Sequence, residues 1–395
     1  MSKLKELIEK LCPNGVQFKS ISEVVKINGY KQLGAADLES LKTKNGEVRL
    51  LPSSNNHDWY TDKKKANDYL CFGEIFTLGR ARNANIKYCK GYFVSSNNVI
   101  VESNEPNKVL TRYLYYFVSS HIKDIYVETS TYPKFDHNSF NKLQVPVPPI
   151  DVQREIVRIL DNFTELTAEL TAELTARRKQ YEYYRDLLLT DLNEDTVKWI
   201  SLKECTLPTS NIKWSLEDES TTYKYIDLTS VDRELHYITE TQEINKNNAP
   251  SRAQQIVKAG DILFATTRPL LKRYCLIDSE YDGQICSTGF CVLRANTDIV
   301  LQKWVLYHIA SSSFYYHVEK YQQGASYPAI SDTNVKDYRI PVPPIEEQER
   351  IVAILDRFDA LCNDLTSGIP AEIEARQKQY EYYRDKLLSF KEVTA

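Results

Sequence analysis

The sequence lacks the short motifs through which enzymes bind nucleotides or hold a base for chemistry. Its 395 residues contain no Gly-Lys dipeptide, which excludes a phosphate-binding P-loop. They also contain no Gly-x-Gly-x-x-Gly segment and no Asn/Asp-Pro-Pro-aromatic run, with which amino-methyltransferases hold a flipped base. His57 and His137 are isolated, and a lone loop histidine is usually just solvated. We therefore expect a chain without catalytic residues.

Two further absences concern metals and the cellular compartment. The eight cysteines form no Cys-x-x-Cys pair and follow no metal-ligand spacing, so we expect reduced thiols and no bound metal. No apolar run approaches the length that spans a bilayer, and the first six residues form a charged amphipathic stretch rather than a signal peptide. These features predict a cytoplasmic protein without a cofactor of its own.

Charge is distributed unevenly along the chain. The net charge of −4 argues against a protein that simply coats DNA, because such proteins are strongly basic. Residues 1–145 carry 21 Lys/Arg against 15 Asp/Glu, whereas residues 146–195 carry 6 against 11 and residues 341–395 carry 7 against 11. A basic segment and acidic helices can coexist in one DNA-binding protein if the helices face something else.

The sequence is a tandem duplication. The stretch from Val145 to Leu166 recurs from Ile340 to Leu361 with 13 of 22 positions identical. The block from Arg177 to Leu189 recurs from Arg376 to Leu388 with 11 of 13 positions identical. Between these blocks the two halves differ freely. Two copies of one scaffold with divergent interiors indicate two copies of one task with different targets.

Each half begins with short β-rich runs separated by turn residues. The expected strands are residues 48–51, 74–78, 99–101, 223–228, 261–265 and 290–293. Aromatic-rich segments at 112–122 and 303–316 have the apolar spacing of helices. The proline blocks at 146–149 and 341–344 must be extended, because proline excludes helical backbone before it. A helix is expected to start directly after each block.

The first of these helices is predicted to be long. It runs from about Asp151 to Leu189, and ~39 residues at ~1.5 Å per residue give a rod of about 58 Å. Two consecutive Leu-Thr-Ala-Glu units, from Leu166 to Glu173, keep leucine on its apolar stripe. The stripe is Ile156, Ile159, Leu160, Phe163, Leu166, Leu170 and Leu174, and its counterpart is Ile351, Ile354, Leu355, Phe358, Leu361 and Leu365. Gly368 and Pro370 predict a break in the second copy.

Stripes of this kind belong either to an ordinary buried core or to a pair of helices packed on each other. We favour the helix pair, because the helices follow two large domains. The predicted fold is α+β: two β-rich, mixed α/β domains separated by two long antiparallel helices that form a coiled-coil spacer. The expected boundaries are 1–145, 146–195, 196–340 and 341–395.

The two repeated blocks closely resemble the specificity subunits of type I restriction-modification systems. Residues 4–16 also resemble the start of that family, and the likeness covers essentially the whole chain, although the Gly368–Pro370 break departs from its pattern. The resemblance implies two target-recognition domains that each read half of a split, asymmetric DNA site, with a fixed unread gap. It also implies two methyltransferase subunits as partners, which would bind S-adenosylmethionine, and restriction (motor-nuclease) subunits in a larger assembly.

Candidate DNA contacts lie in loops of the divergent segments, because arginine pairs well with guanine and asparagine with adenine. The predicted DNA-binding residues of the first half are Ser53, Ser54, Asn55, Arg80, Arg82, Asn83, Lys87, Tyr132 and Lys134. Those of the second half are Thr229, Ser230, Arg233, Thr267, Arg268, Arg273, Ser326 and Tyr327. For each residue the alternative is an ordinary polar side chain on a surface loop.

The repeated Lys-Gln-Tyr-Glu-Tyr-Tyr-Arg-Asp segment presents tyrosines and an arginine on one helix face, and these residue types are enriched in interface cores. The predicted partner-binding residues are Tyr181, Tyr184, Arg185, Tyr380, Tyr383 and Arg384. The alternative is that they close the helix pair on itself. For the whole chain, the competing hypotheses are a coiled-coil adaptor that displays two protein-binding domains and a fused restriction-methylation enzyme.

Overall fold

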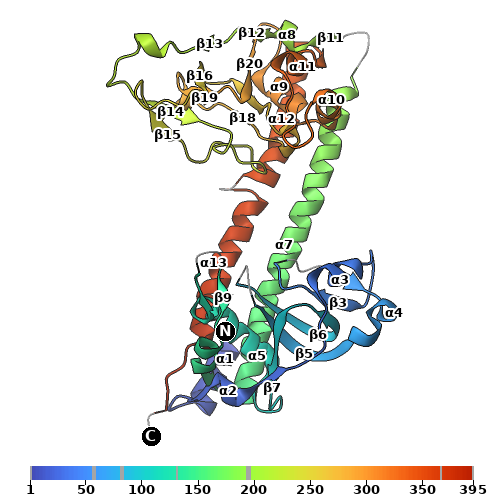
Figure 1. Ribbon diagram of the computed structural model, residues 1–395, viewed down its shortest axis with the longest axis vertical. Coiled ribbons are helices and arrows are strands. Elements are labelled where there is room, and N and C mark those ends of the chain that lie inside the picture. Colours follow the sequence, from blue (N-terminus) through green and yellow to red (C-terminus); the bar gives the residue numbers. More distant parts are fainter. Residues whose placement is uncertain are drawn as a thin grey trace. The chain divides into compact units, whose positions relative to one another are not determined.

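The computed structural model describes residues 2–55, 59–80, 84–129, 132–192, 197–364 and 367–393 (Figure 1). Contacts divide the chain into two compact units, Met1–Glu169 with Glu374–Ala395, and Leu170–Ile373. Each unit therefore combines one β-rich domain with helical segments from both repeats. Within the described ranges, no helix has the length and apolar character needed to cross a membrane.

The first unit is built on a six-stranded sheet. In sheet order the strands are β2 (Val25–Asn28), β7 (Asn98–Ser103), β5 (Cys71–Gly79), β6 (Ile86–Ser95), β3 (Val48–Leu51) and β4 (Trp59–Thr61). Neighbouring strands are antiparallel except for β3 and β6. Side chains alternate between the two faces, so Phe76 and Leu78 share a core with helix α5 (Thr111–Ser120), while Ile75 packs in a second core with Phe93.

The second unit divides the corresponding strands between two sheets. One has the order β12 (Thr206–Leu207), β20 (Phe290–Ala295), β17 (Ile262–Ala265) and β18 (Tyr274–Leu276). The other has the order β13 (Ser210–Asn211), β16 (Ala253–Ile256), β19 (Ile285–Ser287), β14 (Tyr223–Ile226) and β15 (Gln242–Ile244). In the first unit β6 pairs with both β5 and β3, whereas here β18 pairs with β17 and β19 pairs with β14.

Shorter elements complete both units. Those of the first unit are α1 (Ser2–Leu11), α2 (Ile21–Val24), α3 (Ala35–Ser40), α4 (Lys63–Ala66), η1 (Asn67–Tyr69), η2 (Ile122–Ile125), β8 (Tyr126–Val127), β9 (Lys134–Phe135) and α6 (His137–Lys142). Those of the second unit are α8 (Leu202–Cys205), η3 (Trp214–Leu216), η4 (Pro269–Leu271), η5 (Ser279–Tyr281) and α11 (Asp332–Lys336).

All six strands expected from the sequence are present, as β3, β5, β7, β14, β17 and β20. The helix expected at 112–122 is α5. The segment expected as one helix at 303–316 forms two helices, α9 (Gln302–Ala310) and α10 (Ser312–Tyr321). Ser311 separates them, because its side-chain oxygen accepts a hydrogen bond from the Phe314 N–H and caps the second helix.

The proline blocks form short antiparallel ladders that lead into the long helices. β10 (Gln144–Val147) pairs with β1 (Gln17–Ser20), and β21 (Arg339–Val342) pairs with β11 (Lys198–Ser201). Each sheet has only two strands, so a proline without an N–H is tolerated. Helices α7 (Ile150–Thr190) and α12 (Ile345–Asn363) begin shortly after these ladders.

The long helices pair antiparallel, as predicted. α7 is one continuous helix of 41 residues. In the first unit its Phe163 ring stacks on Tyr383 of helix α13 (Ile369–Leu388), with the ring centroids 5.6 Å apart. In the second unit its Tyr184 ring stacks on Phe358 of α12 at 6.2 Å. Later residues of α7 thus meet earlier residues of the second repeat.

The helix of the second repeat is interrupted where the sequence predicted it. α12 ends at Asn363, and α13 begins at Ile369 with Pro370 in its first turn. Gly368 is buried, and a Cβ at this position would lie 2.6 Å from the Ala360 carbonyl oxygen. Only glycine allows this close approach. Leu365, expected on the apolar stripe, lies outside the described residues.

One buried glutamine joins the long helix to the β-rich domain in each unit. Gln153 accepts a hydrogen bond from the Leu110 N–H and donates to the carbonyls of Lys108 and Pro148. Gln348 does the same in the second unit, with Leu301, Ile299 and Pro343 as its partners. Both glutamines are 0% exposed. The domain and the helix are therefore held together through main-chain groups that water cannot reach.

We expect Gln153→Met to destabilise the first unit. The substitution leaves one N–H and two carbonyls without their partner, and each buried unsatisfied group costs ~1–3 kcal/mol. The free energy of unfolding measured in urea should fall by about 3 kcal/mol. The control is Gln144→Met, which alters an exposed glutamine on the adjoining strand. Equal stability of the two variants would contradict the assigned role.

Candidate functional site

Two loops meet at the end of the sheet in the first unit. One follows β3 and contains Ser53, Ser54 and Asn55; the other follows β5 and begins at Gly79. The Asn85 side-chain amide donates to the Ser53 carbonyl at 2.7 Å. A Cβ on Gly79 would lie 2.3 Å from Asn85 Nδ2, so the loops pack too closely for any other residue there.

Lys87 lies beneath these loops rather than on their surface. Its ammonium donates to the carbonyls of Pro52, at 2.6 Å, and Ser54, and to Asn85 Oδ1 at 2.9 Å. Only 2% of the residue is exposed, and burial lowers its pKa to about 8. This corrects the expectation that its side chain is available to DNA, because all three N–H donors are already used inside the protein.

Other predicted residues of the first unit are accessible. Arg80 and Asn55 are exposed, and Ser53 and Ser54 are half-buried. Arg82 and Asn83, like His57, lie outside the described residues.

The Tyr-Pro loop lies beside Arg80. The Phe135 N–H donates to the Arg80 carbonyl at 3.4 Å, so the short strand β9 lies beside this arginine in space. Tyr132 and Lys134, on the same segment, are both exposed. His137 begins α6 and packs edge-on against Phe135. Arg80, Tyr132 and Lys134 thus come from one cluster of loops.

The second unit repeats the loop arrangement with different side chains. Arg273 donates from Nη1 to the carbonyls of Leu228, at 2.6 Å, and Val231, at 2.8 Å. Thr229 is exposed, whereas Ser230 is buried, and the hydroxyls of both donate to Asp227. Arg273 and Ser230 therefore hold the loop from inside, which corrects the expectation that both reach DNA.

Arg268 is an exposed basic residue of the corresponding loop, and its guanidinium packs on an aromatic ring. Its guanidinium carbon lies 4.2 Å from the centroid of the Tyr327 ring. Its backbone is left-handed, with φ of 49°, and its N–H donates to the Pro328 carbonyl at 2.7 Å. Thr267 forms an isolated antiparallel β-bridge with Ala329. This contact joins the arginine loop to the Tyr-Pro loop in the second unit as well. Ser326 and Tyr327 are exposed.

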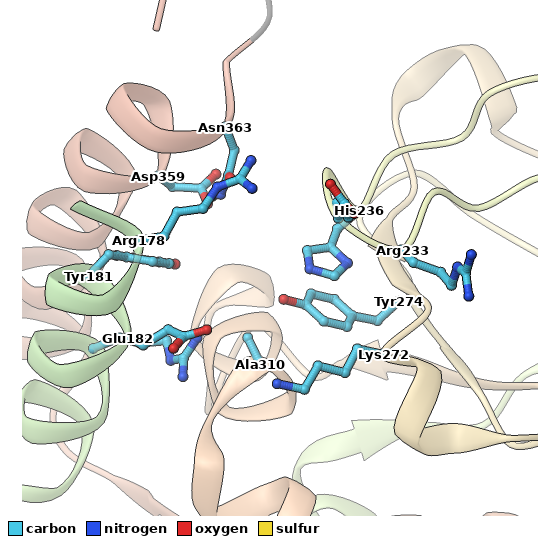
Figure 2. Close-up of a pocket in the computed structure, with 12 residues that line it drawn as sticks. Arg178, Tyr181, Glu182, Arg233, His236, Lys272, Tyr274, Ala310, Asp359 and Asn363 are labelled. Atoms are coloured by element: carbon cyan, nitrogen blue, oxygen red, sulfur yellow. The ribbon is translucent and has the colours of Figure 1, made fainter. Parts of the chain in front are cut away.

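Arg233 lines a cavity of about 200 Å³ within the second unit (Figure 2). Figure 2 shows Tyr181 and Arg178 of α7 facing this cavity from one side, and Tyr274 and Lys272 from the other. The His236 ring stacks on Tyr274 at 3.8 Å, and burial lowers the pKa of His236 to about 4. His236 is therefore neutral near pH 7.

The repeated tyrosine-arginine motif packs against its own chain. Tyr181 and Arg185 are 7% and 5% exposed, and Arg185 pairs with Asp186 at 2.8 Å. Tyr184 stacks on Phe358. For Tyr181 and Arg185, these contacts support the alternative interpretation, closure of the helix pair.

The second copy behaves in the same way. Tyr380 and Tyr383 are partly buried against the core of the first unit, and Arg384 pairs with Asp385 at 2.8 Å. Tyr184 is itself 39% exposed, and the most exposed tyrosines of the motif are Tyr183, at 65%, and Tyr382, at 61%. Sequence reasoning missed them, although each lies two residues after the inward-facing tyrosine and hence on another side of the helix.

Known proteins match the chain along its length. The family model for the type I restriction modification DNA specificity domain matches residues 13–177 and again 200–375. The chain is 35% identical over 320 residues to the type I restriction enzyme EcoR124I/EcoR124II specificity subunit of Escherichia coli, which covers 75% of each chain. It is 29% identical over 409 aligned positions to the type I specificity subunit S.HindORF215P of Haemophilus influenzae, which covers 99% of this chain and 100% of that one.

A solved structure agrees at the level of the fold. The type I restriction-modification system S subunit from M. genitalium superimposes with a TM-score of 0.54 over 95% of this chain and 96% of that one. Sequence identity is 14%, so this likeness concerns the fold alone.

Proposed function

Because the chain belongs to the family of type I restriction-modification specificity subunits, we propose that its two domains each read one half of a bipartite, asymmetric DNA site across a fixed unread gap. Members of this family recognise the DNA target, and catalytic activity lies in other subunits. The chain is thus a DNA-binding subunit rather than an enzyme, and S-adenosylmethionine would be bound by a methyltransferase partner.

The observation that carries this proposal is the duplicated arginine loop. Arg80 and Arg268 both follow the central strand of their sheet, and in both units a main-chain contact ties that loop to the Tyr-Pro segment. A guanidinium on such a loop can bind guanine O6 and N7 together. The surroundings differ, since Arg268 stacks on Tyr327 while Arg80 is followed by a different loop sequence. Similar loops with different side chains suit two different half-sites.

The helices supply the spacer in this proposal. α7 is unbroken over 41 residues and contributes its first part to one unit and its second part to the other. An α-helix rises ~1.5 Å per residue, so a continuous helix of this kind can transmit a distance as a ruler does.

For partners, we propose two methyltransferase subunits, joined by restriction subunits in a larger cytoplasmic assembly. Tyr183 and Tyr382 occupy equivalent positions in the two repeats and are 65% and 61% exposed. Tyrosine is enriched at protein interfaces, and an equivalent pair suits two copies of one partner.

The proposal is tested by co-expressing the chain with its neighbouring methyltransferase gene and mapping methylated adenines across a plasmid library. We expect a split, asymmetric motif with a fixed gap. One continuous motif would mean that only one domain reads DNA. A stable complex without methylation would favour the adaptor hypothesis. Salt gives a second test: binding to DNA through phosphate contacts weakens steeply as the salt concentration rises, and the adaptor hypothesis predicts no such dependence.

We expect Arg268→Ala to relax one position of one half-site. Loss of a bidentate contact to guanine costs ~1–3 kcal/mol of discrimination at that base. Arg80→Ala should relax one position of the other half-site. The measurement is the methylated motif of each variant, with Lys320→Ala, an exposed cation of the same domain, as the control. Uniformly weaker methylation of all sequences would instead identify a phosphate contact.

Inserting one more Leu-Thr-Ala-Glu unit after Glu173 should widen the unread gap. Four residues add ~6 Å of helix, which corresponds to one or two base steps of ~3.4 Å. Motif mapping of the insertion variant measures the change, and Thr171→Ser, which keeps the length, serves as control. An unchanged gap would exclude the ruler.

A further inference from the structure

Lys87 and Arg273 occupy equivalent positions that the proposed contacts to DNA do not use. Each precedes a tyrosine and a buried cysteine, in Lys87-Tyr88-Cys89 and in Arg273-Tyr274-Cys275. Each lies beside the central strand of its sheet: Lys87 is paired with Thr77 of β5, and the Arg273 carbonyl accepts from the Ala265 N–H of β17. The two halves thus place a cation at the same point of the fold.

In the first unit, this cation fixes three consecutive peptide groups of the loop after β3. Lys87 binds the carbonyls of Pro52 and Ser54, and Asn85, itself bound by Lys87, holds the carbonyl of Ser53 between them. With all three carbonyls directed inward, the loop has little freedom to reorient its side chains. Burying an ammonium in this way is costly unless its hydrogen bonds are complete.

In the second unit, Arg273 fixes the loop after β14 in the same manner. One guanidinium nitrogen bridges the carbonyls of Leu228 and Val231, which flank Thr229 and Ser230. The Ser230 carbonyl is held separately by the N–H and hydroxyl of Thr239. Both loops carry side chains that the sequence predicts to contact DNA, and each is therefore shaped from beneath by a cation bound to main-chain oxygens.

On the premise of the function proposed above, we propose that Lys87 and Arg273 are positioning residues for DNA readout, each setting the loop that reads its own half-site. Neither needs to touch DNA. Loss of either cation should therefore relax recognition of one half-site and leave the other unchanged. A residue with only a general structural role would weaken both half-sites together.

The two cations differ in one chemical respect that gives an independent readout. Burial, with a smaller effect of the Arg49 guanidinium on β3, lowers the pKa of Lys87 to about 8. Below that pH the ammonium offers three donors to its three acceptors; above it the neutral amine offers only two. An arginine stays charged at these pH values. Recognition of the first half-site should therefore weaken as the pH rises through about 8, and recognition of the second should not.

The experiment uses the full chain assembled with its methyltransferase subunits. Methylation rates are measured on the mapped site and on DNA with one base changed in either half-site, and their ratio gives the discrimination of each half. The variants are Lys87→Met, Lys87→Arg, Arg273→Met and Arg273→Lys. The matched controls are Lys90→Met, at an exposed cation on β6, and Lys224→Met, at a half-exposed cation on β14.

We expect Lys87→Met to lower discrimination in the first half-site about tenfold, within the range that one base contact provides, and to leave the second within about twofold. Arg273→Met should do the reverse. Lys87→Arg should remove the loss of discrimination between pH 7 and pH 9, and Arg273→Lys should introduce one. Unchanged discrimination, or equal loss in both halves, would overturn the inference while the wild-type bipartite motif still stands. Absence of that motif in the wild type would overturn the proposed function and the inference with it.

Discussion

The buried glutamine at the start of each long helix is the interaction on which the rest of the structure depends. Gln153 and Gln348 each bind three main-chain groups, from the segment before α5 or α9 and from the proline block. A helix that slid or rotated against its domain would leave these groups unpaired in a dry interior, at a cost of ~1–3 kcal/mol each. The loops of each domain are therefore fixed relative to the helix that carries it.

The elements of the fold could be predicted because their signals are local. Short β-rich runs between turn residues identified β5 and β17, and apolar spacing with a proline block identified α7 and α12. The break at Gly368 was also visible, since glycine and proline act on their own backbone. The division of helix 303–316 at Ser311 was missed, because a serine cap interrupts a helix without changing its apolar pattern.

The candidate site was predicted less well, because its side chains are assigned to surface or core by long-range contacts. Arg80 and Arg268 are exposed as expected, whereas Lys87 and Tyr181 are buried against segments distant in sequence. The local sequence around Lys87, on β6, does not indicate that main-chain carbonyls surround its ammonium. The duplication does indicate a shared role for this position, since a basic residue precedes Tyr-Cys in both halves.

The joint that Gln153 and Gln348 form with their domains binds only peptide groups, which every amino acid except proline supplies in full. A domain can therefore change nearly all of its side chains and still fit its helix, provided that the backbone near the joint keeps its course. This separation explains how two halves that diverge freely in their interiors retain matching joints. On the function proposed above, it also makes each domain replaceable in evolution: recombination at the proline blocks would give a lineage a new DNA target without a new architecture.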